Sequence, residues 1–207
     1  MPYLIVHLAI AQRVIDRFPA IKNKGAFYLG SLAPDTSGFA GLDKSASHFC
    51  VGDEGWGFYT NYGEWMDNTL RKINEYRGQV DEDFLLGYLA HMVADIEYAE
   101  QVWTPIRLQN DEALIKEHFA DCGEIDSLLL SKLQNINEIW AALQSSNHHY
   151  LPGLFTCEDV AVLIDKTVNH MYKDRQPNVG YIFTVHNLKK FEAFIESTAN
   201  KILRIIS

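Results

Sequence analysis

Three histidines and one aspartate stand at positions where a helix would turn them toward apolar neighbours. At 100° per residue, Ala11 and Val14 fall within about 40° of His7 on one helix face. His91 and Asp95 are four residues apart, so on a helix their Cβ atoms would lie roughly 5–6 Å apart, one turn above the other. A buried carboxylate needs a cation or several hydrogen-bond donors. The spacing therefore predicts that Asp95 is held by one or the other.

A third histidine, His118, follows the same rule on a later stretch of the chain. It shares a predicted helix face with Leu114, Cys122, Ile125 and Leu129. Three inward-facing histidines on three predicted helices favour metal binding over isolated polar pairs in the core. Imidazole and carboxylate ligands suit zinc, with iron or manganese as alternatives.

A simpler interpretation of His91 and Asp95 is that they hydrogen-bond each other as a polar pair in the core. An isolated H-x3-D on a helix would favour that interpretation. Gly87 and Ala94 lie beside the pair, however, and their small side chains leave room for an ion or for a closely packed helix. Both interpretations stay open on spacing alone.

The elements that carry these residues are predicted to be helices throughout. No segment shows sustained alternation of apolar and polar residues between hairpin turns, so a sheet is not expected. We predict an all-α, single-domain bundle over residues 1–207, of about seven or eight helices. Pro105 is expected to end the fourth helix, and Thr156 with Asp159 is expected to cap the seventh. The expected ranges are 3–19, 24–32, 63–77, 82–103, 110–133, 135–145, 157–173 and 184–206.

The stretch between the second and third predicted helices is irregular and about 30 residues long. Loops of this length are more often functional than loops of ordinary size. Its aromatic and glycine-rich part, GDEGWGFYTNY, is predicted to form the wall or lid of a pocket, with Trp56, Phe58 and Tyr59 as lining residues. The remaining histidines are expected on solvated surfaces or in structural roles, namely His148, His149, His170 and His186.

Composition limits the class of partner. The 207 residues carry a formal net charge of −9, with 47% hydrophobic and 22% charged residues, which is typical of a globular protein. An acidic chain does not favour nucleic acid or an anionic membrane as a general partner. The three cysteines suggest neither a disulfide framework nor a zinc ribbon. The apolar N-terminal run lacks a basic region before it, so we expect neither a signal peptide nor a transmembrane segment. We therefore expect a cytoplasmic location.

Four segments together resemble the zinc-dependent phospholipase C family, which is all-helical and shares its fold with single-strand-specific zinc nucleases. They contain His7 on the first helix, GSLAPD ending at Asp35, SHF with His48, and GYLAHMVAD with His91 and Asp95. The match in order and approximate spacing extends from residue 1 to about residue 130. The resemblance implies hydrolysis of a small-molecule or lipid phosphoester by a metal-activated water.

The resemblance also implies a set of ligands for one to three zinc ions. Asp35, His48, His91 and Asp95 would surround one zinc, and His7 would join a bridging Asp95 at a neighbouring zinc. Asp35 is in addition the candidate catalytic carboxylate. His118 would serve a further ion, since the family has H-x3-E on its next helix.

The chain departs from the family pattern at three places. It begins only six residues before His7, although secreted members bring their freed N-terminal residue to the metal from farther away. The H-x3-E of the next helix is here His118-x3-Cys122. The family's histidine after the aspartate is missing, so other side chains would have to complete a second site, with Glu97, Glu100, Gln101, Cys122, Glu124 and Asp126 as the candidates.

Two other functions compete with a phosphoesterase. The HD class of helical phosphohydrolases requires adjacent His and Asp, and the chain has no such dipeptide. A catalytically degenerate member of the same fold, with a structural or sensory metal, is the alternative that the departures support. The sequence indicates no oligomeric state.

Overall fold

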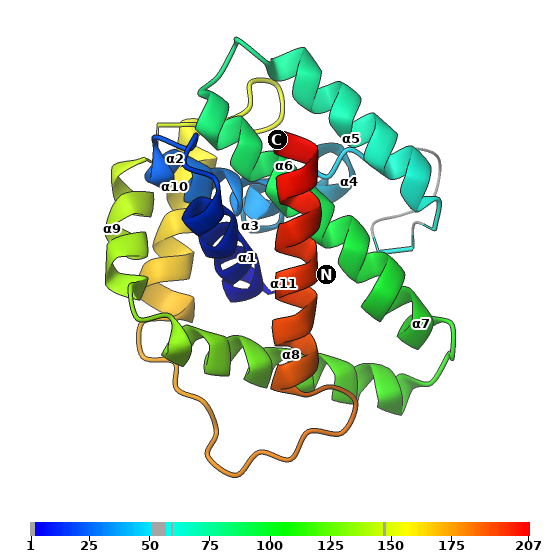
Figure 1. The fold of residues 1–207 in the computed structure, drawn as a ribbon. Coiled ribbons are helices and arrows are strands. Elements are labelled where there is room, and N and C mark those ends of the chain that lie inside the picture. Colours follow the sequence, from blue (N-terminus) through cyan, green and yellow to red (C-terminus); the bar gives the residue numbers. More distant parts are fainter. Residues whose placement is uncertain (1–2, 51–56, 59, 147) are drawn as a thin grey trace.

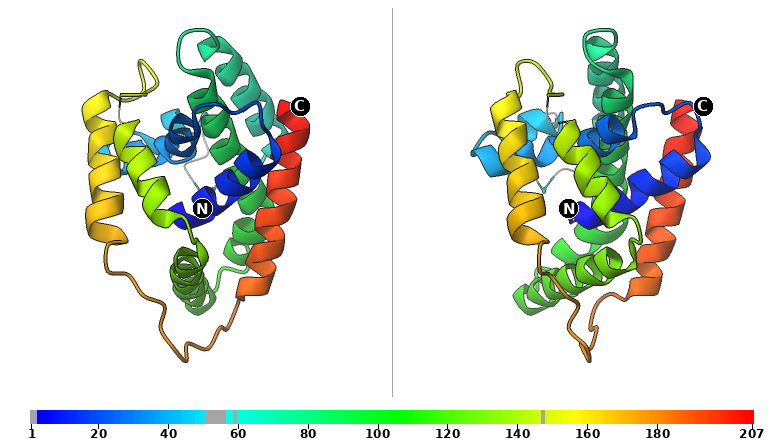
Figure 2. Two further views of the ribbon diagram at one scale, coloured as in Figure 1. Left: turned by 60° about the vertical axis from the view of Figure 1, so that its left-hand side comes forward. Right: turned by 90° about the vertical axis from the view of Figure 1, so that its left-hand side faces the viewer.

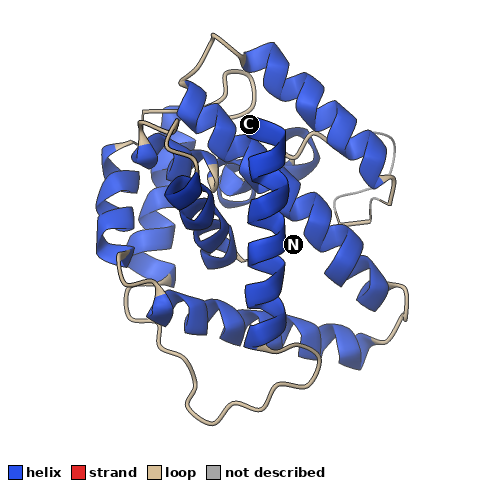
Figure 3. Cartoon of the chain, in the orientation of Figure 1, coloured by secondary structure: helices blue, strands red, loops and turns tan. Residues whose placement is uncertain are grey.

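The computed structural model describes residues 3–50, 57–58, 60–146 and 148–207, and this part of the chain is built from helices without a strand. The all-α prediction is therefore confirmed (Figure 3). The α-helices in chain order are α1 (Leu4–Arg17), α2 (Lys24–Gly30), α3 (Thr36–Ala40), α4 (Lys44–Ser47), α5 (Tyr62–Tyr76), α6 (Glu82–Tyr98), α7 (Thr104–Arg107), α8 (Glu112–Lys132), α9 (Ile136–Ser145), α10 (Cys157–Asp165) and α11 (Leu188–Ile206). A 3₁₀ helix, η1 (Ala33–Asp35), and two π-helical segments, η2 (Ala99–Trp103) and η3 (Lys166–Met171), connect some of them.

Each of the eight predicted helices has a counterpart, and the capping box of Thr156 and Asp159 is present at the start of α10. Two details differ. The stretch predicted to be irregular contains the short elements η1, α3 and α4. Pro105 also does not end its helix, because the chain continues through α7 to Arg107. Proline lacks an N–H, and the π segment η2 before it changes the bonding pattern, with the Thr104 N–H donating to the carbonyl of Ala99 five residues back.

The core is centred on α6, which runs diagonally behind α11 in Figure 1 and is buried along nearly its whole length. It packs against α1, α2, α5 and α11. Figure 2 shows α9 and α10 lying side by side on the opposite side of α1 from α11. No helix of the described ranges is both long enough and apolar enough to span a membrane.

Glycine allows α2 and α6 to approach each other closely. A Cβ added to Gly87 would lie 2.1 Å from the carbonyl oxygen of Phe27, and one added to Gly30 would lie 2.0 Å from that of Phe84. No side chain can occupy either position without separating the helices. Gly87 thus makes room for a neighbouring helix rather than for an ion, and this contact places the end of α2 against His91.

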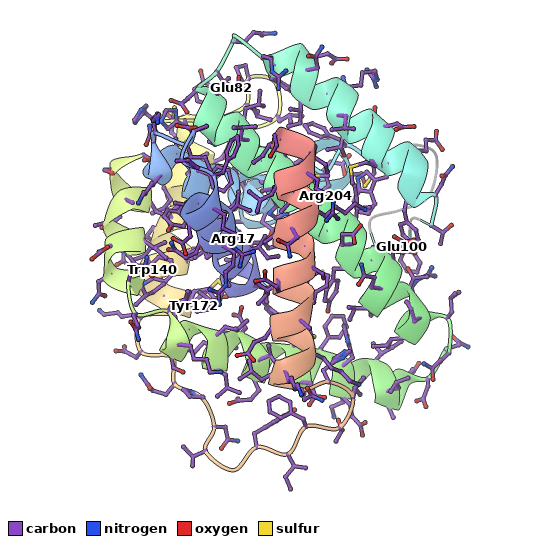
Figure 4. All side chains as sticks on the ribbon, in the orientation of Figure 1. Arg17, Glu82, Glu100, Trp140, Tyr172 and Arg204 are labelled. Atoms are coloured by element: carbon purple, nitrogen blue, oxygen red, sulfur yellow. The ribbon has the colours of Figure 1, made fainter. Side chains whose placement is uncertain are left out.

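The first turn of α1 is capped by a residue from another helix. Its N-cap, Tyr3, makes no side-chain cap, and the Ile5 N–H instead donates to Oδ1 of Asp126 on α8, at 3.1 Å. The Tyr172 hydroxyl donates to the other oxygen of Asp126 at 2.6 Å, and its ring stacks on Trp140 (Figure 4). Burial raises the pKa of the Asp126 carboxyl to about 6. This contact fixes the helix that carries His7.

Candidate metal centre

Five residues predicted to bind metal lie together beside the middle of α6. His7 comes from α1, Asp35 from η1, and His48 directly follows α4. His91 and Asp95 lie one turn apart on α6. Their potential ligand atoms form two overlapping groups, His7 with Asp35 and His91, and His48 with His91 and Asp95, in which all atoms lie within 4.8 Å of one another.

Asp95 is at the middle of the cluster. Its Oδ1 lies 3.4 Å from Nε2 of His7, and its Oδ2 lies 3.4 Å from Nε2 of both His48 and His91. These separations exceed an ordinary N–H···O hydrogen bond of about 2.7–3.2 Å. Two ligand atoms at ~2.0–2.1 Å from a tetrahedral zinc would lie roughly 3.3–3.4 Å apart. The spacing therefore fits the ligands of a shared ion better than it fits a hydrogen-bonded pair.

The cluster contains buried polar atoms that nothing in the described chain satisfies. Both ring nitrogens of His7, Nε2 of His91 and both carboxylate oxygens of Asp95 lack a hydrogen-bond partner among the described residues. His7 and His91 are 1% exposed and Asp95 is fully buried. An uncompensated buried carboxylate costs several kcal/mol. A simple hydrogen-bonded pair of His91 and Asp95 is thus not what the structure contains, and the donor set fits a cation.

Backbone carbonyls orient two of the three imidazoles. Nδ1 of His91 lies 2.9 Å from the carbonyl oxygen of Ser31, and Nδ1 of His48 lies 2.9 Å from that of Lys44. A carbonyl only accepts, so Nδ1 carries a proton in each ring and Nε2 faces Asp95, where a neutral ring would present its lone pair to an ion. Outer contacts of this kind are typical of histidines that bind metal. The ring of His7 stacks on His91 with centroids 3.8 Å apart.

The charges in the cluster favour a cation. Burial lowers the pKa of His48 to about 3, so this ring is neutral near pH 7. Burial raises the pKa of the Asp95 carboxyl, but His91 and His7 outweigh it and hold that pKa well below its usual range. Burial likewise raises the pKa of Asp35, while His91 and Lys44 bring it below its ordinary value. Asp95 and Asp35 in turn raise the pKa of His91, although burial lowers it, so a protonated His91 supplies positive charge to the two carboxylates in the absence of an ion, and a divalent ion would supply it in its place.

His118 belongs to a second cluster with Cys122 and His186, whose ligand atoms also lie within 4.8 Å of one another. Nδ1 of His118 lies 2.7 Å from Nε2 of His186, and its Nε2 lies 3.1 Å from the hydroxyl of Tyr98. The Cys122 sulfur lies 3.3 Å from the same hydroxyl. Burial raises the pKa of Cys122 to about 11 and, together with the nearby His186, lowers that of His118 to about 4. A neutral thiol, phenol and imidazole therefore satisfy one another here, and His118 as a ligand stays a prediction.

The carboxylates considered for completing a second site have other partners or other positions. Lys201 and Gln101 bind the two oxygens of Glu97. Glu100 is exposed on the outer side of η2 (Figure 4). Glu124 accepts the N–H of Asn178, and Asp126 caps α1.

Other expectations have mixed outcomes. Trp56 and Tyr59 of the predicted pocket wall lie outside the described residues. Phe58 is 57% exposed, with the Arg107 guanidinium 5.0 Å from its ring centroid. His186, expected to be structural, lies against His118 although 68 residues separate them. Two contributors went unnoticed in the sequence, the carbonyl of Ser31 and the side chain of Lys44, because a carbonyl leaves no signal in residue type and Lys44 matches no metal-ligand pattern.

One comparison with known proteins finds a match over the segment that contains these five residues. The model of the family described as zinc dependent phospholipase C matches residues 6–97, somewhat under half of the chain. No curated protein and no solved structure matches the chain significantly. Over residues 6–97, which contain all five clustered residues, the chain therefore matches the zinc-dependent phospholipase C family, and the resemblance of its motifs is confirmed.

Proposed function

We propose that the protein is a metal-dependent phosphoester hydrolase whose ion or ions are bound by His7, Asp35, His48, His91 and Asp95. The observation that carries this proposal is that buried nitrogens of His7 and His91 and both oxygens of Asp95 lie about 3.4 Å apart and have no hydrogen-bond partner among the described residues. Zinc is the ion that this donor set suits best, with iron or manganese as alternatives. The family match over these residues supports zinc and a phosphoester substrate.

The chain's own residues would divide the work as follows. Asp95 directs Oδ1 toward His7 and Oδ2 toward His48 and His91, which suits a carboxylate that bridges two sites. A zinc ion bound here would supply a water whose pKa is lowered to about 7 for attack on phosphorus. The lowered pKa of Asp35 and the 13% exposure of its side chain support it as the carboxylate that would hold the proton of that water.

The substrate that we propose is a small-molecule or lipid phosphoester. The net charge of −9 disfavours nucleic acid as a general partner. A cytoplasmic location stays an expectation from the sequence.

The first experiment measures metal content and turnover in one set of variants. We expect purified protein to contain at least one equivalent of transition metal by inductively coupled plasma analysis, and to hydrolyse a nitrophenyl phosphomonoester, phosphodiester or phosphocholine analogue with zinc, manganese or iron. His91→Ala should lose both properties. His170→Ala is the matched control, because that histidine is exposed and pairs only with Asp165 in the described structure. Protein with no metal and no uptake of zinc would contradict the proposal.

A non-catalytic metal site is the second candidate, and one observation favours it. Four of the five side chains are at most 1% exposed, as expected for a closed structural or sensory site. In that case metal content would be normal in the wild type and no phosphoester would be turned over above the His91→Ala background with any of the three metals.

A further inference from the structure

Among the five clustered side chains, Asp35 is the one with appreciable exposure to solvent. The side chains of His7, His48, His91 and Asp95 are at most 1% exposed. Asp35 is 13% exposed, and Lys44 beside it is 32% exposed. A substrate that approaches the cluster from this side meets the Lys44 ammonium.

Lys44 is held in place at both ends. Its carbonyl oxygen accepts the backbone N–H and the ring Nδ1–H of His48, each at 2.9 Å. Its ammonium donates to Oδ1 of Asp35 at 2.7 Å. The aliphatic stem between them lies over Gly38 of α3, where an added Cβ would be only 2.7 Å from Cε of Lys44. The ammonium is thereby set at the edge of the cluster rather than extended into solvent.

The Lys44 ammonium affects the net charge at this edge of the cluster. Among the five clustered residues, Asp35 and Asp95 would neutralise one divalent ion, and the Lys44 ammonium beside Asp35 adds a positive charge to that edge of the cluster. A positive, partly exposed centre favours an anion over a neutral ligand. Hydrogen bonds from an ammonium to a phosphoryl oxygen are also stronger than those between neutral groups.

We propose that Lys44 binds the anionic phosphoryl oxygen of the substrate at this centre, which restricts the substrate class to phosphoesters that carry a negative charge. The proposal rests on the proposed function and assigns a role in substrate binding to a residue outside the set of ligands. Neutral phosphotriesters and carboxylic esters lack the charge that Lys44 recognises.

The test measures binding of inorganic phosphate to zinc-loaded protein by isothermal titration calorimetry, with zinc content determined for every variant. Lys44→Met removes the charge at similar length, and Lys44→Arg keeps it. Gly38→Ala keeps the lysine but places a methyl group where its stem lies. Lys72→Met is the matched control, since Lys72 pairs with Glu75 on the surface of α5.

We expect phosphate affinity to fall by about tenfold or more in Lys44→Met, since a charged hydrogen bond is lost. Lys44→Arg should stay within a few-fold of the wild type, Gly38→Ala should fall between the two, and Lys72→Met should be unchanged. In turnover, Lys44→Met should raise KM for a nitrophenyl phosphodiester more than it lowers kcat. It should leave any hydrolysis of a nitrophenyl phosphotriester unaffected.

Zinc content separates this proposal from the proposed function. A wild type that takes up no zinc contradicts the metal centre and the Lys44 role together. Full zinc content with wild-type phosphate affinity in Lys44→Met contradicts the Lys44 role alone, as does a zinc-loaded wild type that binds no phosphate. If Lys44→Met fails to fold or to load zinc, Lys44→Gln takes its place, and wild-type phosphate affinity in that zinc-loaded variant contradicts the Lys44 role.

Discussion

The two histidine clusters differ in what their polar atoms contact. Around Asp95, buried nitrogens of His7 and His91 face the carboxylate oxygens at 3.4 Å, and no hydrogen bond to these atoms is found within the described ranges. Around Tyr98, a chain of contacts runs from Cys122 through the phenol and His118 to His186, at 2.7–3.3 Å. The first cluster is costly without a cation, and the second is satisfied by its own members. The number of histidines does not distinguish the two clusters, whereas the hydrogen bonds made by their donors and acceptors do.

The largest expected effect is the loss of stability when metal is removed from the first cluster. Removing metal with a strong chelator should leave the Asp95 charge unpaired, which costs about 3–5 kcal/mol and lowers the Tm by roughly 10 °C for a chain of this size. Added zinc should restore the Tm. Differential scanning calorimetry measures both. Asp95→Ala should melt at a temperature independent of chelator and zinc, and a variant that still responds like the wild type would show that Asp95 is not the central ligand.

A second experiment disturbs the contact between α2 and α6 that supports His91 of the first cluster. Gly87→Ala places a methyl group about 2.1 Å from the Phe27 carbonyl oxygen and must separate α2 from α6. We expect a loss of roughly 2–4 kcal/mol in urea unfolding, together with weaker zinc binding in chelator competition, because Ser31 would no longer orient His91. Gly63→Ala in α5 serves as the control, because its added Cβ would meet Asn61 Oδ1 only at an ordinary contact distance of 4.0 Å. Unchanged zinc affinity in Gly87→Ala would show that the packing of α2 against α6 does not affect metal binding.

The third prediction concerns the pH dependence of stability. The pKa of Asp126 on α8 is raised, whereas that of Asp95 in the first cluster is lowered, so the two carboxyls should change the free energy of unfolding in opposite directions as pH rises. Burial raises its pKa from 3.8 to about 6, so the folded state binds more protons than the unfolded state between these values. The resulting stability is fully present below pH 3.8 and is lost as pH rises through about 6. Urea unfolding should show wild type losing up to roughly 3 kcal/mol more than Asp126→Asn between pH 4 and 7. Parallel curves for the two proteins would contradict the raised pKa.

The smallest effect is expected in the second cluster. His118→Gln removes one member of a satisfied neutral chain, which costs about 1–2 kcal/mol, and should leave the response of Tm to chelator intact. His91→Gln, the equivalent change in the first cluster, should abolish that response. Zinc stoichiometry in His118→Gln also tests its predicted role, since a value lower by one than in the wild type would confirm His118 as a ligand.

Helical periodicity sufficed to predict the helices and the inward direction of three ligand candidates. His7, His91 and Asp95 lie on regular helices, where position along the chain determines direction. Asp35 and His48 lie on or beside short elements of three and four residues, whose geometry depends on tertiary contacts, so only the family resemblance indicated them.

Contacts between distant segments set the limit of sequence reasoning. The partner of His118 is His186, which lies beyond η3 and is positioned by Asp121, whose carboxylate accepts the N–H groups of Thr184, Val185 and His186. No local pattern relates these positions. The missing side chain of Gly87 predicts free space beside His91, but only the packing of α2 shows that a helix and not an ion takes that space.

The capping of α1 by Asp126 bears on the order in which the protein is made. A ribosome that has synthesised residues 6–97 has produced all five residues of the first cluster, but not the carboxylate that closes the first turn of the helix carrying His7. That carboxylate follows only with α8, and its own partner Tyr172 later still. His7 is therefore the first of the five to be translated, yet the first turn of its helix is closed only after the other four have been made.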